Sequence, residues 1–473
     1  MRIALADLPK KESYYHAAFP NLGLLYLAGA LRARFGRACE ILWLDPLRNL
    51  KEHLDSLDAF RPDIYGLSFS YFTRELAANV IERVRSRFPA LPIVCGGPMP
   101  TASPRRILEE TAADVCVRGE GEEALCDLVD SFGGRGRGLK DIPGIAYKTP
   151  NGKVVETAHR APVSDLDRIP LPAWDLVDFR KYGGWYMHRA SPQAHVLANR
   201  GCPYDCVYCS NPVWKYGKPW LRLRSPAGIA EEVRLLYGLG VREVYLSADE
   251  LNVNERWARE VCEAIAALGR RDLFLNANIR PDVITPELAQ AFRRAGLWIA
   301  HLGIESGNQK TLDGVGKKVT LEQIVNCCRI LKAAGIKVFG FVMLFHAWEE
   351  AGHLRWESPE DVDRTLVFCR RLLKDKLMDY LSWQTATPMP GSRLWDIAVR
   401  HGLLPHRAIR GIFERNLRLP GVTDKDVQRA LRRGLWLKGL AALRNGGFSI
   451  RHVHAVLANA KVMLGLGPPR GAY

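Results

Sequence analysis

Three closely spaced cysteines are the residues of this chain best suited to carry chemistry. Cys202, Cys206 and Cys209 stand in the run Gly-Cys-Pro-Tyr-Asp-Cys-Val-Tyr-Cys-Ser from 201 to 210, with the spacing C-x3-C-x2-C. Three thiolates at this spacing can hold three irons of a [4Fe–4S] cluster and leave the fourth iron without a protein ligand. An open iron can bind a substrate, just as a catalytic zinc keeps a free coordination site. A four-cysteine electron-transfer site would close that position, so the spacing predicts a cluster that takes part in a reaction.

Other uses of the three thiols fit the sequence less well. A zinc site would need a further Cys or His at finger spacing, and the next cysteine is Cys262. Disulfides are not expected in a chain that shows no signal peptide and has eleven cysteines scattered along it.

The cysteine motif, with the aromatic Tyr208 before its last cysteine, resembles that of the radical S-adenosylmethionine (SAM) superfamily. In that superfamily the open iron binds the amino and carboxylate groups of SAM and passes it an electron. The resulting deoxyadenosyl radical takes a hydrogen atom from the substrate. The resemblance therefore implies two cofactors, a [4Fe–4S] cluster and SAM, and an electron donor of flavodoxin or ferredoxin type.

The segment around the cysteines alternates between strand and helix patterns. Short apolar runs predict strands, and amphipathic runs between them predict helices. Six such units suit a partial (β/α)6 barrel over residues 195–394, whose reactive groups lie at the carboxyl ends of the strands. The predicted strands are 195–201, 243–250, 273–280, 299–306, 338–345 and 380–387, and the helices include 227–237, 255–268, 321–334 and 359–373.

Polar residues at the ends of these strands resemble the SAM-binding segments of the superfamily. An acidic partner suits the SAM ammonium, and a guanidinium can bind its carboxylate in a bidentate manner. A Gly-x-Glu-Ser-Gly turn ends the fourth strand, near the expected ribose. The resemblance implies SAM contacts from Tyr208, Asp249, Glu250, Asn278, Arg280, Glu305 and Ser306.

Residues 1–145 carry a second alternating pattern and predict a Rossmann-like parallel sheet covered on both faces. Strands are expected at 2–8, 39–45, 63–70, 91–97 and 114–120, with helices at 22–35, 75–88 and 122–132. The segments 20–28, 94–98 and 117–122 resemble the cobalamin-binding domain that precedes many radical SAM domains. The Asp-x-His-x-x-Gly motif that supplies a cobalt ligand in many of those domains does not occur. We therefore expect cobalamin to be absent and the domain to shape the active site.

Two further segments complete the α/β architecture. Residues 146–194 are rich in Pro and Asp and read as a linker, because proline favours extended chain over helix. Residues 395–473 turn helical, at 427–442 and 450–464, and predict a C-terminal helical domain that packs on the barrel.

Composition excludes several classes of function. Hydrophobic residues make up 47% and charged residues 25% of the 473 residues, and no apolar run reaches the roughly 18 residues of a membrane span. The formal charge of +16 invites a nucleic-acid interpretation, but the basic residues are dispersed along predicted helices. We expect a cytoplasmic protein that binds neither membrane nor nucleic acid.

A narrower resemblance implies a particular reaction. The chain length, the missing cobalt-ligand motif and the segment 210–222 look like the radical SAM diol-dehydratases of aminoglycoside antibiotic biosynthesis. Such a lyase abstracts hydrogen from C4′ of a paromamine-like substrate and eliminates the C3′ hydroxyl, which leaves a 4′-keto-3′-deoxy product for an NADPH-dependent reductase. The alternative is a cobalamin-dependent radical SAM methyltransferase of natural-product biosynthesis.

Dehydration needs a group that moves a proton, and an aminoglycoside needs an acidic pocket. Tyr216 follows the last cysteine closely and is the predicted catalytic acid or base. The predicted substrate-binding residues are Glu250, His301, Glu349 and Glu350.

Two other classes stay open at this point. A tRNA methylthiotransferase-like enzyme would need a second cluster, but Cys39, Cys95 and Cys116 fall in or beside predicted strands, which leaves Cys126. A non-catalytic cofactor-binding module is disfavoured by the intact cysteine motif, because a sensor has little need of an open iron.

Overall fold

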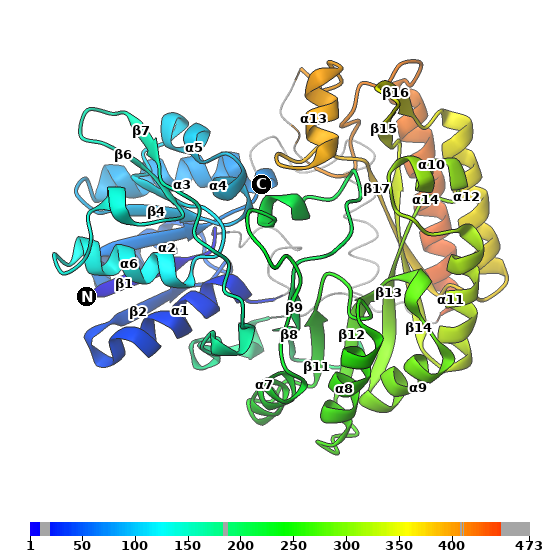
Figure 1. Ribbon diagram of the computed structural model, residues 1–473, viewed down its shortest axis with the longest axis horizontal. Coiled ribbons are helices and arrows are strands. Elements are labelled where there is room, and N and C mark those ends of the chain that lie inside the picture. Colours follow the sequence, from blue (N-terminus) through cyan, green and yellow to red (C-terminus); the bar gives the residue numbers. More distant parts are fainter. Residues whose placement is uncertain (10–18, 183–187, 407–408, 410, 446–473) are drawn as a thin grey trace.

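The computed structural model describes residues 1–9, 19–182, 188–406, 409 and 411–445. Within these residues the chain forms two α/β units that lie side by side (Figure 1). The N-terminal unit is built on a seven-stranded sheet, and the second unit on a six-stranded, all-parallel sheet. The predicted α/β class is confirmed.

The N-terminal sheet has the strand order β2-β1-β3-β4-β5-β6-β7. Its first five strands are parallel, as expected from their alternation with helices. They are β1 (Arg2–Ala6), β2 (Glu40–Leu44), β3 (Ile64–Ser68), β4 (Ile93–Gly96) and β5 (Val115–Val117).

Alternate residues of these strands face opposite layers of helices, as the two-residue period of a strand requires. Ile3 and Leu5 pack toward one hydrophobic cluster, and Ala4 and Ala6 toward another. The first cluster includes α1 (Leu22–Phe35) and α6 (Glu122–Phe132); the second includes α2 (Leu50–Phe60), α3 (Arg74–Arg87), α4 (Pro98–Ala102) and α5 (Pro104–Glu110).

The sheet extends past residue 145, the predicted end of the domain. β6 (Ile145–Lys148) pairs antiparallel with β5, and β7 (Val154–Glu156) pairs antiparallel with β6. The linker therefore begins after β7. It is fastened by buried side chains, among them Trp174, whose indole Nε1 donates to the buried Glu232 Oε1 at 3.0 Å.

The second sheet has the order β17-β14-β13-β12-β11-β8, with all strands parallel. Because its strands run the same way, their carboxyl ends meet at one rim, where the barrel predicts the site. All six predicted strands are present, as β8 (Gln193–Leu197), β11 (Glu243–Ser247), β12 (Phe274–Ile279), β13 (Leu297–Glu305), β14 (Lys337–Leu344) and β17 (Tyr380–Thr385).

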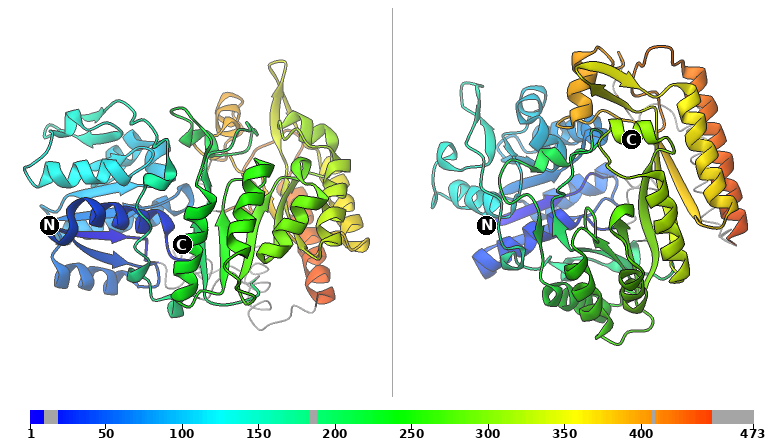
Figure 2. Two further views of the ribbon diagram at one scale, coloured as in Figure 1. Left: turned by 60° about the horizontal axis from the view of Figure 1, so that its bottom comes forward. Right: turned by 45° about the vertical axis from the view of Figure 1, so that its right-hand side comes forward.

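Helices cover the outside of this barrel (Figure 2). They are α7 (Pro226–Gly238), α8 (Glu255–Ala266), α9 (Pro286–Ala295), α10 (Gln309–Gly314), α11 (Leu321–Ala333) and α12 (Pro359–Lys374). Two short pairings lie outside the main sheets. The strands β9 (Asn199–Arg200) and β10 (Arg222–Leu223) pair with each other, and β15 (Ala347–Glu350) and β16 (His353–Trp356) form a hairpin.

The C-terminal part contributes α13 (Arg393–Arg400) and α14 (Asp424–Arg444), and α14 runs along α12 and β17 (Figure 2). The Trp383 indole of β17 donates to the Gly434 carbonyl at 2.7 Å. The predicted helix at 427–442 is confirmed, and the one at 450–464 falls outside the described residues. Among the described helices, none is both long and apolar enough to cross a membrane.

We expect a helix glycine to be required where α14 meets the barrel. A Cβ at Gly434 would lie 2.8 Å from the Trp383 ring, whereas a Cβ at Gly439 of the same helix would meet nothing within 4 Å. Gly434→Ala should lower the free energy of unfolding by up to about 2 kcal/mol, because overpacking costs about 1–3 kcal/mol and the gain in helix propensity offsets about 1 kcal/mol of that cost. Gly439→Ala, the matched control, should raise it by about 0.5–1 kcal/mol. Urea unfolding of both variants measures the difference, and equal shifts would contradict this packing.

Candidate functional site: two adjacent cavities

The cysteine loop follows β9 and is fixed to the barrel by backbone hydrogen bonds. The Val207 N–H donates to the Val315 carbonyl at 2.9 Å, and the Val207 carbonyl accepts from Leu394 N–H at 2.9 Å. The loop opens on Gly201, which has φ 91° and whose Cβ, if present, would collide with the Trp220 carbonyl. Only glycine fits this close approach at positive φ.

All three cysteines are free and line one cavity of about 500 Å³ at the barrel rim. The Asn211 N–H donates to Cys209 Sγ at 3.4 Å. In the described part of the chain, no three Cys, His, Asp or Glu side chains converge on one metal ion. A [4Fe–4S] cluster does not require three ligands on one metal ion, because each of its three cysteines binds a different iron. Three free thiols on one cavity wall therefore fit the cluster.

The cavity wall beside the cysteines is charged. Asp249 and Glu250 follow β11, Arg280 follows β12, and Glu305 ends β13 with φ 60°. The sequence predicted these four residues and did not predict Lys317, whose Nζ lies 3.4 Å from Glu305 Oε1. Lys317 is in the loop after α10, and that loop carries no recognisable motif from which the residue could have been predicted.

Burial and charge tune this wall. Burial raises the pKa of Glu250 to about 7, helped by the neighbouring carboxylates and opposed by Lys317 and Arg280. Burial also raises the pKa of Asp249, although hydrogen bonds from the Asn211 side chain and the Gly201 backbone oppose it. The Arg280 side chain is 1% exposed, stacks on the Tyr204 ring at 3.5 Å, and pairs through Nε with Asp282 at 2.7 Å.

The structure also places Asn278, Tyr208 and His301 on this cavity. The Asn278 Oδ1 accepts from the Tyr245 hydroxyl at 2.7 Å. His301 packs against Phe339, Phe341 and Tyr245, and burial lowers its pKa to about 3, so the imidazole is neutral.

Four predicted site residues lie elsewhere. Ser306 is fully buried, and its hydroxyl donates to Glu357 at 2.9 Å. Glu349 binds Arg400 and His401 at the hairpin, and Glu350 binds the exposed Arg355. None of these three lines the cavity.

Tyr216 is the fourth, and it belongs to the contact between the two units. Its hydroxyl accepts from the Glu120 N–H at 3.0 Å, and its ring stacks on His159 at 5.3 Å. A Cβ at Gly119 would collide with the Tyr216 hydroxyl. The loop after the cysteines turns toward the N-terminal unit at this point, so Tyr216 lines neither cavity.

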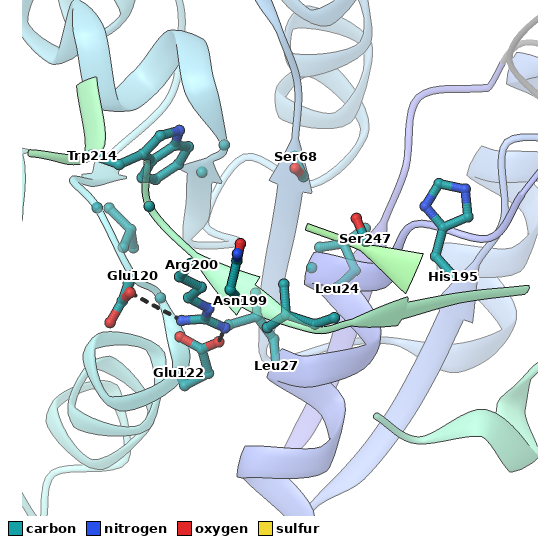
Figure 3. Close-up of a pocket in the computed structure, with 18 of the residues that line it drawn as sticks. Leu24, Leu27, Ser68, Glu120, Glu122, His195, Asn199, Arg200, Trp214 and Ser247 are labelled. Atoms are coloured by element: carbon teal, nitrogen blue, oxygen red, sulfur yellow. Dashed lines mark hydrogen bonds and ion pairs between the residues drawn. The ribbon is translucent and has the colours of Figure 1, made fainter. Parts of the chain in front are cut away.

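A second cavity, of about 590 Å³, lies between the N-terminal sheet and the barrel (Figure 3). Its N-terminal wall consists of the carboxyl ends of β3, β4 and β5 and the apolar face of α1, including Gly96, Gly97, Gly119, Leu24 and Leu27. This is the edge at which ligands bind in open parallel sheets. The two cavities share four residues, Asn211, Tyr245, Asp249 and Asn278.

Buried charges close one side of this second cavity (Figure 3). The Glu120 carboxylate forms ion pairs with Arg222 at 2.7 Å and with Arg200 at 3.2 Å, and Arg200 also pairs with Glu122. Burial alone would raise the pKa of Glu122, but Arg200 holds it below its usual value. The pairs join the Gly-Glu-Gly-Glu turn of the N-terminal unit to the strand that precedes the cysteines.

His195 of β8 is a cavity residue that sequence analysis missed (Figure 3). Its ring stacks on Tyr245 at 4.8 Å, and burial lowers its pKa to about 4. The sequence around a lone histidine in a strand does not indicate that it lines a cavity, because this cavity forms between distant segments.

Comparisons with known proteins match both units. The family model of the radical SAM superfamily matches residues 196–356, and that of the B12 binding domain matches residues 15–129. An uncharacterized methyltransferase of Pyrococcus horikoshii is 31% identical over 401 residues, 81% of this chain and 80% of its own. The chain belongs to the radical SAM superfamily. Within it, the chain has the two-domain arrangement of cobalamin-dependent members.

Two further proteins are similar to this radical SAM protein. The hopanoid C-3 methylase of Methylococcus capsulatus is 27% identical over 79% of this chain and 68% of its own. The structure of the cobalamin-dependent SAM radical enzyme OxsB, with aqua-cobalamin and SAM bound, superposes with a TM-score of 0.75. It is 18% identical and covers 98% of this chain and 70% of its own, which shows a shared fold.

Two expectations from the sequence are wrong. The Pyrococcus relative is named as a methyltransferase and the Methylococcus relative as a methylase, so the dehydratase assignment and its aminoglycoside substrate are overturned. The B12-binding match overturns the expected absence of cobalamin. The missing Asp-x-His-x-x-Gly motif was a poor guide because it reports one cobalt ligand, whereas the cavity is made of glycine turns and apolar side chains.

We expect the three loop cysteines alone to carry iron. The triple variant Cys202→Ala, Cys206→Ala, Cys209→Ala should lose all of the roughly four irons per chain and should no longer cleave SAM. The matched control is Cys95→Ala with Cys116→Ala, because those thiols are fully buried partners on β4 and β5. Iron analysis and the visible spectrum after anaerobic reconstitution measure the outcome. Iron retained in the triple variant, or lost from the control, would contradict the assignment of the cluster to the three loop cysteines.

Proposed function

We propose that this protein is a cobalamin-dependent radical SAM methyltransferase. The observation that carries the proposal is the shared wall of the two cavities, one lined by the three cysteines and one by the glycine turns of the N-terminal unit. A methyl donor and a radical initiator must both reach one substrate, and adjacent cavities would hold the two cofactors close to each other.

The charge of the first cavity supports SAM as its occupant. Three carboxyl groups, Asp249, Glu250 and Glu305, stand against two cations, Arg280 and Lys317. SAM carries an ammonium, a sulfonium and one carboxylate, so it is a net cation at neutral pH. Because Arg280 is already engaged by Asp282, the free charge of the wall is mostly negative and complements SAM.

The shape of the second cavity supports cobalamin. Gly96 lines the cavity, and a Cβ placed there would meet nothing within 4 Å, so this turn faces open space. Leu24 and Leu27 of α1 add an apolar surface for a flat ring. Arg200, Asn199 and Ser247 stand on the barrel side and offer polar partners for amide groups (Figure 3).

Asn199 holds the turn that carries Asp249 and Glu250 in place between the two cavities. Its Oδ1 accepts from the Asp249 N–H at 3.1 Å, and its Nδ2 donates to the Glu250 carbonyl at 3.4 Å. When bound, the cluster supplies an electron for SAM cleavage and cobalamin carries a methyl group. The proposal includes a one-electron donor of flavodoxin or ferredoxin type. The residues of the chain hold the two cofactors on either side of the shared wall and keep the reaction away from water.

The reaction class is tested by product mass. The protein is reconstituted anaerobically with iron, sulfide, cobalamin, SAM and a low-potential reductant, and incubated with a cell extract of small molecules. A gain of CH2 in one compound, labelled when the SAM methyl group is labelled, is expected. Loss of water, or loss of hydrogen without added carbon, would contradict methyl transfer.

We predict that filling the second cavity blocks cobalamin and spares the cluster. Gly96→Leu should lower cobalamin binding by about 100-fold or more, because overlap of a side chain with a bound ligand is not relieved in a packed interior. Gly238→Leu is the control, since it also has open space but lies at the end of α7. Gel filtration with visible spectroscopy measures bound cobalamin, and the iron content should match wild type in both variants. Full cobalamin binding by Gly96→Leu would place the cofactor elsewhere.

A further inference from the structure

The cysteine-lined cavity has a second wall whose chemistry is different from that of the charged one. It consists of Phe72 from the N-terminal unit, Phe341 and Met343 of β14, Gln384 and Thr385 of β17, and Thr387, Met389 and Ile412. None of these side chains carries a charge. The cavity lining therefore has a charged part beside the cysteines and a neutral, mostly apolar part that comes from other segments.

Two hydroxyl groups on the neutral wall are already engaged by the protein. Thr385 Oγ1 is engaged by the carbonyls of Ile412, at 3.0 Å, and Glu414, at 2.6 Å. Thr387 Oγ1 donates to the Thr385 carbonyl at 3.0 Å. The buried Asn416 amide donates to both hydroxyl oxygens, at 3.2 and 2.8 Å. This closed network leaves the threonines little capacity to bind a polar ligand.

Gln384 differs from these threonines. Its side chain is partly exposed in the cavity, and within the described part of the chain its amide forms no hydrogen bond. An amide offers both a donor and an acceptor and carries no charge. It suits a neutral polar group such as a hydroxyl, a carbonyl or another amide.

Among the described residues that line the cavity, the two cations are already paired and are not available to an anionic ligand. Lys317 is paired with Glu305, and Arg280 with Asp282. Moving a charged group against Phe341, Met343 and Phe72 without a partner costs free energy, whereas moving an apolar group there gains it.

We infer that the methyl acceptor bound at this wall is an uncharged, largely apolar molecule whose one polar group is recognised by Gln384. The inference rests on the proposed function, since SAM and the cluster are taken to occupy the charged side. It goes further by excluding phosphorylated, carboxylated and polycationic acceptors at this position.

Three indole probes of similar size test the inference. Indole-3-acetamide is neutral, indole-3-acetate is its anionic isostere, and tryptamine is a cation. Equilibrium dialysis is done on protein reconstituted with cluster, cobalamin and SAM, without reductant, so that no turnover occurs. The acetamide should bind at least about tenfold more tightly than either charged probe, a difference of about 1.4 kcal/mol.

Two variants of Gln384 locate the binding. Gln384→Met keeps the volume and should weaken binding of the acetamide about threefold to tenfold, because it removes one neutral hydrogen bond. Gln384→Glu should weaken binding of the acetamide further and should strengthen binding of tryptamine. Glu350→Gln, on the hairpin outside the cavity, should change neither.

SAM binding in the same samples separates the two claims. If SAM binding fails in wild type, the proposed function fails with it. If SAM binds but the acetamide shows no preference, shows no binding, or is insensitive to both Gln384 variants, the inference about the acceptor is overturned and the proposed function stands.

Discussion

The short turn after β11 is the constraint on which the site depends, because it forms the wall between the two cavities. Asp249 faces both of them. Asn199 fixes the turn by binding the Asp249 N–H and the Glu250 carbonyl. Asn199 also lies on the strand that leads into Gly201 and the cysteine loop. A shift of this turn would therefore move the charged wall, the cysteines and the rim of the second cavity together.

The contact between the two units depends on buried charge. Glu120 and Glu122 come from the turn after β5, and Arg200 and Arg222 from the β9–β10 pair. Removing one member of a buried pair leaves an unpaired charge, which costs about 3–5 kcal/mol. The Val163 N–H and carbonyl complete the network, at 2.9 and 2.8 Å. Buried pairs of this kind tolerate few alternative arrangements, so they fix how the N-terminal unit faces the barrel.

Local patterns predicted the fold well. The six barrel strands and the helices at 22–35 and 122–132 follow from apolar periodicity, which acts over neighbouring residues. The antiparallel strands β6 and β7 were missed because they fall in a Pro-rich stretch and gain their stability from pairing with β5. Of the residues that line the cysteine cavity, Asp249, Glu250, Arg280 and Glu305 were predicted because parallel strands bring their carboxyl ends to one rim. Lys317 and His195 were missed because a cavity assembled from distant segments leaves no local trace.

The error about the reaction has the same physical origin. Closeness in sequence to Cys209 made Tyr216 a candidate for proton transfer, yet the loop carries it to the Glu120 N–H of the other unit. The cysteine motif predicts the radical-generating chemistry, because its three candidate ligands lie within eight residues and need no distant partner. The acceptor that we infer depends instead on the neutral part of the cavity lining, which joins Phe72, Met343, Gln384 and Ile412 across 340 residues of sequence. The initiating chemistry can therefore be predicted from a short motif, while the choice of acceptor is a property of the folded cavity.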